Sequence, residues 1–507
     1  MSIYEQQDPP VRDTRLSIVD SYSGCGCDFV NCAKEGCMFK KDRSFWQANA
    51  CQMSLSLMMA ATVENSVIIL HAPIGCGVQM STLASNTDSG KLKRGLDNNS
   101  VVWLSTNMKK QDIIGGGEKS LRETIRYADK EFRPEIIFVV VTCAPSIIGD
   151  DVGEVVKSES ENIAADITYI HCPGFKSRVV ASAYDSFYHS LIKHIQFEPE
   201  PYVDYNPDDF ANPYNRGGLV NYQYNKGRTV NLFNATSINP DDEAEIVRLL
   251  NALDLNVQIF AEYSSRDKMR FISEAALNVS MCNVHDDYIL KYLEEKYGIP
   301  YIIQGMPLGK AGIRKWLVSI ASFFGKEEMA ERICDYEEKR LDAALEEFLP
   351  KLQGKRVLLG GGVVRVAEEA RMLRELGMDV IGVRAYHYDN GAESVYEELG
   401  EELPDVPLAV STQLFELVNQ LKKTDPDIIV EHPGKHGWIA KTGYPSICLF
   451  GPGRPFLGYI GEYAFVRNLA FQLENHAFSK KLSKKIKLPY KKEWFDKDPY
   501  SYIKEGK

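Results

Sequence analysis

Short apolar runs alternate along the chain with longer stretches in which apolar residues recur every three to four positions. The short runs predict buried strands, and the longer periodicity predicts amphipathic helices. A first series has expected strands at Ser66–Leu70, Glu135–Val141 and Asp166–Ile170, with a helical pattern over Glu118–Asp129 between the first two. This order of elements is typical of an α/β protein.

The same order occurs twice more. A second series starts at Thr229–Asn234 and contains helical patterns over Asp241–Leu253 and Tyr288–Tyr297, the latter ending at Gly298 as a helix stop. A long charged helical stretch, Glu327–Leu349, leads into a third series. The other strands expected in these two series are Val257–Glu262, Leu277–Met281, Pro300–Gln304, Arg356–Leu359, Asp379–Val383, Asp427–Val430 and Ser446–Phe450.

This alternation predicts three α/β domains, each a doubly wound parallel sheet. A Pro-, Tyr- and Asn-rich stretch, Glu198–Lys226, separates the first two domains. Because ligands of such sheets bind beyond the carboxyl ends of strands, we expect the sites where the domains face one another. The expected divisions are a cysteine-rich N-terminal arm over 1–45, domains over 46–225, 226–350 and 351–478, and a basic C-terminal tail over 479–507.

Composition excludes several classes of protein. The 507 residues carry 59 Lys and Arg against 70 Asp and Glu, a net charge of −11, so we expect no nucleic-acid partner. No apolar stretch reaches about 18 residues and the N-terminus lacks a signal-peptide pattern, so we expect a cytoplasmic protein without membrane contact. The lysine run over 480–492 is expected to be a solvated tail, with docking on an acidic partner as the alternative. No phosphate-binding loop occurs, so any ATP would be bound by another chain.

Three cysteines lie at turn-like positions close to expected strands: Cys51, Cys76 and Cys143. Cys76 follows the first strand and lies between two glycines, which allow a tight turn with backbone amides close to sulfur. Cys143 follows the second strand. Both strand ends suit metal ligands gathered at one sheet edge, although each cysteine taken singly is better explained as a small buried residue.

The segment from Cys51 to Asp151 resembles the nitrogenase component 1 superfamily. The motifs that carry the resemblance are HAPIGCG at His71–Gly77, GGGEKSL at Gly115–Leu121 and C-x5-GDD at Cys143–Asp151. The resemblance implies that Cys51, Cys76 and Cys143 bind a P-cluster-like iron–sulfur cluster shared with a β-type homologous subunit, in an α2β2 heterotetramer. Coordination counting agrees, because Cys-ligated clusters commonly take four thiolates.

A second match surrounds Cys282. Leu277–Cys282 and the EEKYGIP of Glu294–Pro300 are similar to the α-subunit segment whose single cysteine anchors the active-site metallocluster. The resemblance therefore implies an iron–sulfur metallocluster on Cys282 and an α-type subunit. A core cysteine at a buried strand end is the alternative.

The chain departs from the family pattern at the other end of that cofactor. Aligning Gly443-Tyr444-Pro445 with the family's G-x-P puts Phe450 where the family has a metal-binding histidine. Phenylalanine cannot coordinate a metal. The candidates for a second ligand are, in order, Cys448, His436 and His432, because iron in clusters prefers thiolate.

A second departure follows the motif Cys172–Phe175. Val180 and Tyr184 stand where the family has a Gln and a His beside the dinitrogen-reducing face, which argues against dinitrogen as the substrate. Tyr184 is the candidate catalytic proton donor, although a phenol is a weak acid at neutral pH.

The N-terminal arm holds a further group of cysteines, interleaved with glycines: Cys25, Cys27, Cys32 and Cys37. Four thiols this close together can surround an extra iron–sulfur or zinc site, since glycine lets the loop turn around sulfur. A flexible thiol-rich arm is the alternative.

The resemblance implies a nitrogenase-like oxidoreductase: a catalytic α-type subunit that receives low-potential electrons from an ATP-dependent iron–sulfur reductase and reduces a small molecule. The missing histidine and the cysteine-rich arm favour the methylthio-alkane reductase branch, which cleaves a carbon–sulfur bond. A non-catalytic scaffold for maturation of a nitrogenase-type cofactor is the alternative, and a tetrapyrrole reductase is a weaker one.

Overall fold

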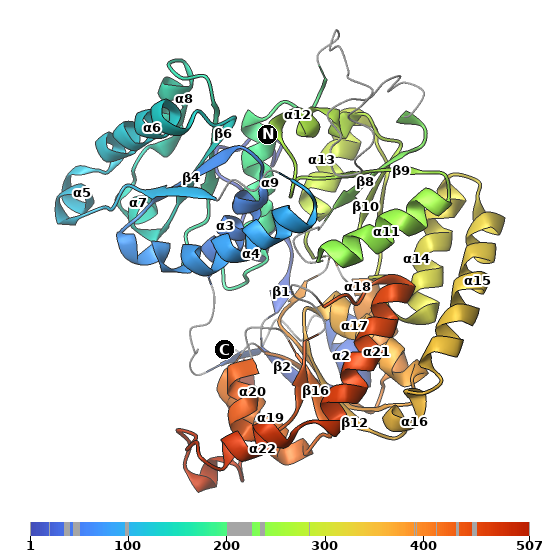
Figure 1. The fold of residues 1–507 in the computed structure, drawn as a ribbon. Helices are drawn as coiled ribbons and strands as arrows, with labels where there is room; N and C mark the ends of the chain where they lie inside the picture. Colours follow the sequence, from blue (N-terminus) through green and yellow to red (C-terminus); the bar gives the residue numbers. More distant parts are fainter. Residues whose placement is uncertain are drawn as a thin grey trace.

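The computed structural model describes residues 2–19, 21–34, 41–43, 51–96, 101–199, 226–233, 239–282, 284–389, 391, 393–411, 413–431, 436–448 and 454–505. Within these ranges the chain forms two four-stranded sheets and one six-stranded sheet, together with two short strand pairs. Each large sheet lies among helices, and the three domains surround a central region (Figure 1). The predicted class, α/β with three parallel-sheet domains, is confirmed.

The first domain has a parallel sheet in the order β5-β4-β6-β7. Its central strand β6 is wholly apolar and buried, and successive side chains point to opposite faces. Ile137 and Val139 pack with α6 and α8, whereas Phe138 and Val140 pack with α3 and α9. The elements are β4 (Ser66–His71), β5 (Val102–Ser105), β6 (Ile136–Val141), β7 (Asp166–His171), α3 (Gln52–Thr62), α4 (Met80–Lys93), α6 (Glu118–Phe132), α8 (Val152–Ser160) and α9 (Ser182–His194).

The second domain has the parallel order β11-β10-β8-β9. Its helix α13 ends at Gly298, whose φ of +67° is the left-handed conformation that glycine adopts at low cost, as the sequence predicted. The elements are β8 (Thr229–Phe233), β9 (Asn256–Ile259), β10 (Leu277–Ser280), β11 (Tyr301–Ile303), α11 (Pro240–Ala252), α13 (Asp287–Tyr297), α14 (Gly309–Phe323) and α15 (Glu327–Leu345).

The third domain has the order β17-β16-β12-β13-β15-β2, and all its pairs are parallel except the last. The elements are β12 (Arg356–Gly361), β13 (Asp379–Ala385), β14 (Tyr388–Asp389), β15 (Pro407–Val410), β16 (Ile428–Val430), β17 (Ser446–Ile447), α17 (Val363–Glu375), α18 (Glu393–Glu402), α19 (Leu414–Thr424), α20 (His436–Thr442) and α21 (Gly458–Glu474).

The N-terminal segment is folded rather than an extended arm. It forms α1 (Arg12–Arg15), β1 (Ile18–Val19), the edge strand β2 (Tyr22–Cys25) and α2 (Gly26–Lys34). Figure 1 shows β2 and α2 in blue within the third domain and β1 at its edge. The reason is aromatic packing, since Phe29 is buried against Tyr22, Tyr388 and Tyr396.

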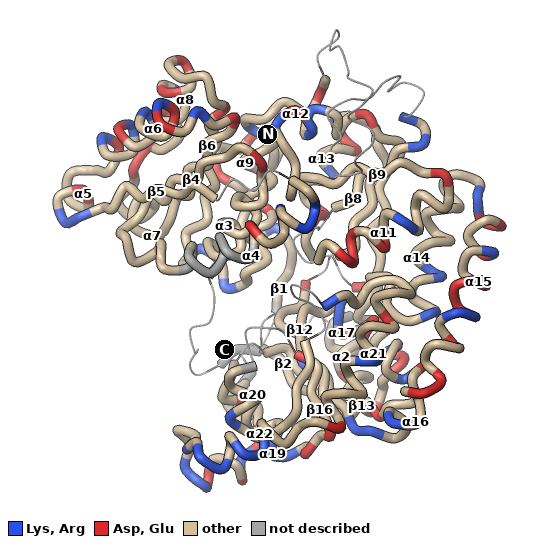
Figure 2. Tube along the Cα trace, in the orientation of Figure 1, with Lys and Arg blue, Asp and Glu red and all other residues tan. Residues whose placement is uncertain are grey.

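Strands β5 and β15 were not predicted from the sequence. All four residues of β5 are half-buried. At the C-terminus, α22 (Ala477–Ser483) is followed by β18 (Ile503–Glu505), which pairs with β3 (Lys41–Arg43). The lysines of the run over 480–492 are exposed. They form the blue segment near α22 in Figure 2. The predicted connector Glu198–Lys226 lies almost wholly outside the described residues. In the described part of the chain, no helix has the length and apolar character to cross a membrane.

Candidate metal centres

Three half-buried cysteines lie in the first domain, at positions that the sheet determines. Cys76 is in a 3-10 segment (Ile74–Gln79) just after β4, and Cys143 begins α7 (Cys143–Ile148) just after β6. Because β4 and β6 are parallel neighbours, both thiols lie at the same sheet edge. Cys51 is the N-cap residue of α3.

Gly174 links two of these cysteines. Its backbone N–H donates to Cys143 Sγ at 3.2 Å. A Cβ on Gly174 would lie 3.6 Å from Cys51 Sγ and 3.7 Å from Cys143 Sγ, so the two sulfur atoms face the same small space. Burial raises the pKa of Cys76, and the neighbouring Cys143 and Cys51 add to the rise. The structure thus brings together the three predicted interface ligands.

The chemistry of the three thiols fits an iron–sulfur cluster better than a single ion. Thiolates around one tetrahedral ion lie about 3.8 Å apart, given metal–sulfur bonds of about 2.3 Å. In the described part of the chain these three sulfur atoms do not all lie within 4.8 Å of one another. A polynuclear cluster accepts the wider spacing, and three thiolates leave room for a further ligand.

Large apolar side chains are exposed around these thiols. Ile74 and Val78 flank Cys76 at 56% and 74% exposure, Ile147 follows Cys143 at 69%, and Phe175 follows Gly174 at 56%. A group of exposed apolar residues around metal-ligating side chains is typical of a protein–protein contact.

Asp150 joins the motifs that surround these thiols. Its carboxylate accepts from the backbone N–H of Gly117 at 3.0 Å and contacts His71 Nε2 at 3.0 Å. A Cβ on Gly117 would lie 2.8 Å from both His71 and Asp150, so glycine is required there. Burial lowers the pKa of His71. These contacts hold the turns that carry Cys76 and Cys143.

Cys172 is a fourth cysteine close to these three, and sequence reasoning gave it no role. It is wholly buried, and burial raises the pKa of its thiol. Its Sγ lies 3.8 Å from the carbonyl oxygen of Val141. Cys172 is therefore a core residue behind the site.

Cys282 follows β10 and is buried, with 3% of its surface exposed. Ser280 Oγ accepts the N–H of Cys282 at 3.1 Å and contacts Asp286, which in turn accepts from the hydroxyl of Tyr188 at 2.7 Å. Burial raises the pKa of the Cys282 thiol to about 12, although Arg365 and Arg12 lower it. A bound metal removes the proton from such a thiol. These surroundings of Cys282 therefore suit a cysteine that anchors a metal.

Tyr184, the predicted proton donor, lies on α9 close to this cysteine. Its ring stacks on His285 with centroids 4.0 Å apart and an interplanar angle of 14°. His285 is three residues beyond Cys282, and its N–H donates to the Cys282 carbonyl oxygen at 3.3 Å. Burial holds the pKa of His285 well below its usual value, and the cations Arg365 and Arg12 contribute. Tyr184 therefore meets the Cys282 loop from the first domain.

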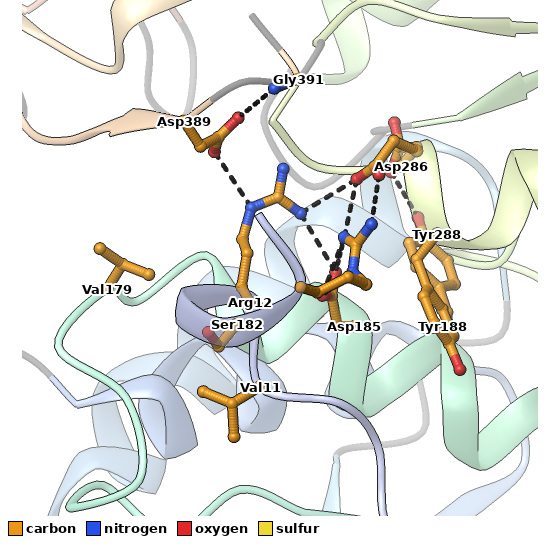
Figure 3. Close-up of polar contacts among 12 residues, drawn as sticks. Val11, Arg12, Val179, Ser182, Asp185, Tyr188, Asp286, Tyr288, Asp389 and Gly391 are labelled. Carbon is orange, nitrogen blue, oxygen red and sulfur yellow. Dashed lines mark hydrogen bonds and ion pairs between the residues drawn. The ribbon is translucent and has the colours of Figure 1, made fainter. Parts of the chain in front are cut away.

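The region beside Cys282 is crossed by a buried ion network that sequence reasoning missed (Figure 3). Arg12 bonds Asp185 of the first domain at 3.1 Å, Asp287 of the second at 3.0 Å and Asp389 of the third at 3.1 Å. Arg15 bonds Asp185 and Asp287 as well. One N-terminal residue thus connects all three domains.

His387 is a second residue that the sequence did not reveal. It lies on the turn between β13 and β14, and its Nε2 is 3.2 Å from Asp389 Oδ2. The side chain is 11% exposed and contributes to the electrostatic field at His285. A histidine held by a carboxylate through one ring nitrogen is a common arrangement in metal sites.

The candidates for a second cofactor ligand are only partly described. Cys448 is buried and lines a cavity of about 340 Å³ with Arg454, Phe465 and Arg467. His436 begins α20, but its side chain is not described, and His432 and Phe450 lie outside the described residues. The choice of second ligand stays a prediction.

The N-terminal cysteines are brought together in part. The ligand atoms of Cys25, Cys27 and Asp28 lie within 4.8 Å of one another. Cys32 is disulfide-bonded, and Cys37 lies outside the described residues. The four-thiol metal site stays a prediction.

The fold and these thiols define an α/β protein with candidate metal ligands at the ends of parallel strands. Residues 51–474 match the family model of nitrogenase component 1 type oxidoreductases, and the chain belongs to this family. It is 25% identical over 451 residues to the nitrogenase molybdenum-iron protein alpha chain of Methanothermobacter marburgensis, covering 87% of this chain and 89% of that protein.

Other relatives carry a different name. The chain is 26% identical over 426 residues to the nitrogenase iron-molybdenum cofactor biosynthesis protein NifE of Methanococcus maripaludis, covering 82% of each. A solved structure of nitrogenase Cp1 at pH 5 superposes with a TM-score of 0.69 at 21% identity, over 92% of this chain and 100% of that one. This likeness confirms the fold. The family match and the similarity to alpha chains confirm the prediction that the chain is an α-subunit-like member of the nitrogenase component 1 superfamily.

Proposed function

We propose that this chain is the catalytic α-type subunit of a nitrogenase-like oxidoreductase that reduces a small molecule at an iron–sulfur metallocluster held by Cys282. The observation that carries the proposal is the surroundings of Cys282. Its buried thiol lies where the second domain meets Tyr184 of the first and Arg365 of the third. An anchoring thiolate, a phenol–imidazole stack and a cation in one enclosed region suit reductive chemistry that consumes protons.

The three thiols of the first domain would receive the electrons. Cys51, Cys76 and Cys143 would hold a cluster that a β-type subunit completes, and the exposed Ile74, Val78, Ile147 and Phe175 support a partner surface there. The electron donor is a separate ATP-dependent iron–sulfur reductase, as expected from the family.

When bound, the metallocluster supplies electrons to the substrate. The residues of this chain do the rest: the Ser280–Asp286–Tyr188 contacts orient the Cys282 loop, and the Tyr184 hydroxyl, whose ring stacks on His285, would donate a proton. For a methylthio-alkane substrate, two electrons and two protons would break one carbon–sulfur bond and yield methanethiol and a hydrocarbon.

A cofactor-maturation scaffold is the second candidate. The observation that favours it is the similarity to NifE of Methanococcus maripaludis, at 26% identity against 25% for the alpha chain of Methanothermobacter marburgensis. A scaffold would bind a metallocluster on Cys282, release it to an acceptor protein and show no turnover.

The test uses the complex with its partner, purified without oxygen. In Cys282→Ser we expect loss of the active-site cluster signal and of substrate reduction, with interface-cluster iron and subunit assembly retained. Cys334→Ser is the matched control, because Cys334 is buried in α15, away from these sites. Full turnover with unaltered spectra in Cys282→Ser would refute the proposal. Cluster transfer without turnover in the native complex would select the scaffold.

A further inference from the structure

The surface at Cys25–Asp28 carries a further group of thiols in the third domain. It is separate from the site of Cys51, Cys76 and Cys143 and from the site of Cys282. The ligand atoms of Cys25, Cys27 and Asp28 lie within 4.8 Å of one another. Cys27 and Asp28 are exposed and Cys25 is half-buried. Among the described residues this is the one group of three metal-ligating side chains that lies so close together.

The backbone beneath these residues is held at every position. Cys25 ends β2 and pairs with Pro407, while the N–H groups of Gly26 and Cys27 donate to the carbonyl oxygens of Val406 and Pro404 at 3.1 and 3.0 Å. A Cβ on Gly26 would lie 2.1 Å from the Leu403 carbonyl oxygen, so only glycine allows this approach. The two thiols are therefore presented on a fixed frame.

The Cys25 thiol accepts a backbone hydrogen bond, and the neighbouring Cys27 thiol raises the pKa of Cys25. The backbone N–H of Asp28, in the first turn of the nine-residue helix α2, donates to Cys25 Sγ at 3.3 Å. Two thiols and a carboxylate are residue types that bind zinc, and a water molecule can fill the fourth position.

We propose that Cys25, Cys27 and Asp28 form a surface binding site for a thiophilic divalent cation, Zn²⁺, with two thiolates, one carboxylate and one open position. Binding releases the two thiol protons to solvent and needs no oxidant or reductant. The sulfur atoms move only slightly, since thiolates around one zinc ion lie about 3.8 Å apart. The site stands on its own geometry and is independent of the proposed function.

The probe is Zn²⁺ alone, added to the anaerobic complex, with alkylation of each cysteine followed by mass spectrometry. We expect one equivalent of Zn²⁺ to protect Cys25 and Cys27 from alkylation, and a chelator to reverse the protection. In Asp28→Asn the zinc concentration needed for protection should rise on the order of tenfold. Residue-resolved alkylation separates this site from the other thiols of the chain.

The matched variant is Asp13→Asn, which changes another carboxylate of the N-terminal segment, one that hydrogen-bonds Ser177 instead. We expect it to leave zinc protection unchanged. Equal alkylation of Cys25 and Cys27 with and without Zn²⁺ would overturn the proposal, as would unchanged zinc dependence in Asp28→Asn. Unaltered iron content and thermal midpoint in each variant would show that the fold is intact.

Discussion

The guanidinium of Arg12 donates from Nε to Asp389 Oδ2 across 3.1 Å, with both side chains fully buried. This contact fixes the N-terminal segment to the third domain directly before β1 pairs with β14. Because the same guanidinium also bonds Asp185 and Asp287, one side chain is shared by carboxylates from three domains. Arg12 therefore contributes to how these domains close around the Cys282 region.

Replacement of Arg12 by Ala should destabilise the contact between the domains. The three carboxylates would stay buried without the Arg12 charge, with Arg15 beside Asp185 and Asp287 and His387 beside Asp389. Breaking a buried ion pair costs about 3–5 kcal/mol. We expect a lower urea midpoint and faster proteolysis between the domains.

The control for Arg12→Ala is Lys93→Ala, whose ion pair with Asp241 is solvent-exposed. An exposed pair contributes about 1 kcal/mol or less, so this variant should resemble the native protein. Equal stability of Arg12→Ala and Lys93→Ala would contradict the role assigned to Arg12.

Alanine at Cys76 or Cys143 should lower the iron content of the complex and block electron delivery. A methyl group cannot replace a thiolate ligand, and the cluster would also hold the partner chain. Cys172→Ala is the control, because this wholly buried thiol is not a predicted ligand. Iron analysis and the assembly state of each purified variant test the assignment, and equal iron in all three variants would remove it.

Gly174→Ala should disturb the same site without removing a ligand. The added methyl would lie 3.0 Å from Cys51 Cβ and within 3.7 Å of two sulfur atoms, in the space that a cluster would occupy. We expect reduced iron content and a shifted cluster spectrum, with the thermal midpoint of the second and third domains unchanged. Gly75→Ala is a matched control, because a Cβ there meets nothing within 4 Å. Native iron content in Gly174→Ala would place the cluster elsewhere.

The sequence predicted those parts of the molecule that depend on local pattern. Apolar runs located β4, β6 and β7, and strand ends located Cys76 and Cys143, because parallel neighbours share one edge. The network around Arg12 could not be predicted in this way. Its partners lie 173 to 377 positions away in the sequence, and a polar N-terminal stretch has no periodicity that reveals burial.

His285 and His387 were missed for a related reason. Each histidine becomes relevant only because two domains meet. Tyr184 stacks on His285, and His387 contributes to the electrostatic field at His285. Likewise, the antiparallel addition of β2 to β15 depends on the aromatic contacts of Phe29 across the third domain. The spacing of residues along the chain does not reveal such contacts between distant segments.

Glu462 on α21 should make the stability of the protein depend on pH. Burial raises its pKa to about 8, with Glu375 adding to the rise, from a usual value of 4.5. The folded chain thus holds this proton more tightly than the unfolded chain does. Its contribution to stability is fully present below about pH 4.5 and is lost as the pH rises through 8, at up to about 1.4 kcal/mol per pH unit.

Glu462→Gln tests this pH dependence, because the amide stays neutral at every pH. We expect the urea midpoints of the variant and the native protein to agree near pH 4.5, and the variant to become the more stable protein as the pH rises toward 8. Glu474→Gln on the same helix is the control, since the Glu474 side chain is 52% exposed and should follow the native curve. Parallel curves for Glu462→Gln and the native protein would mean that the buried carboxyl does not take up a proton on folding.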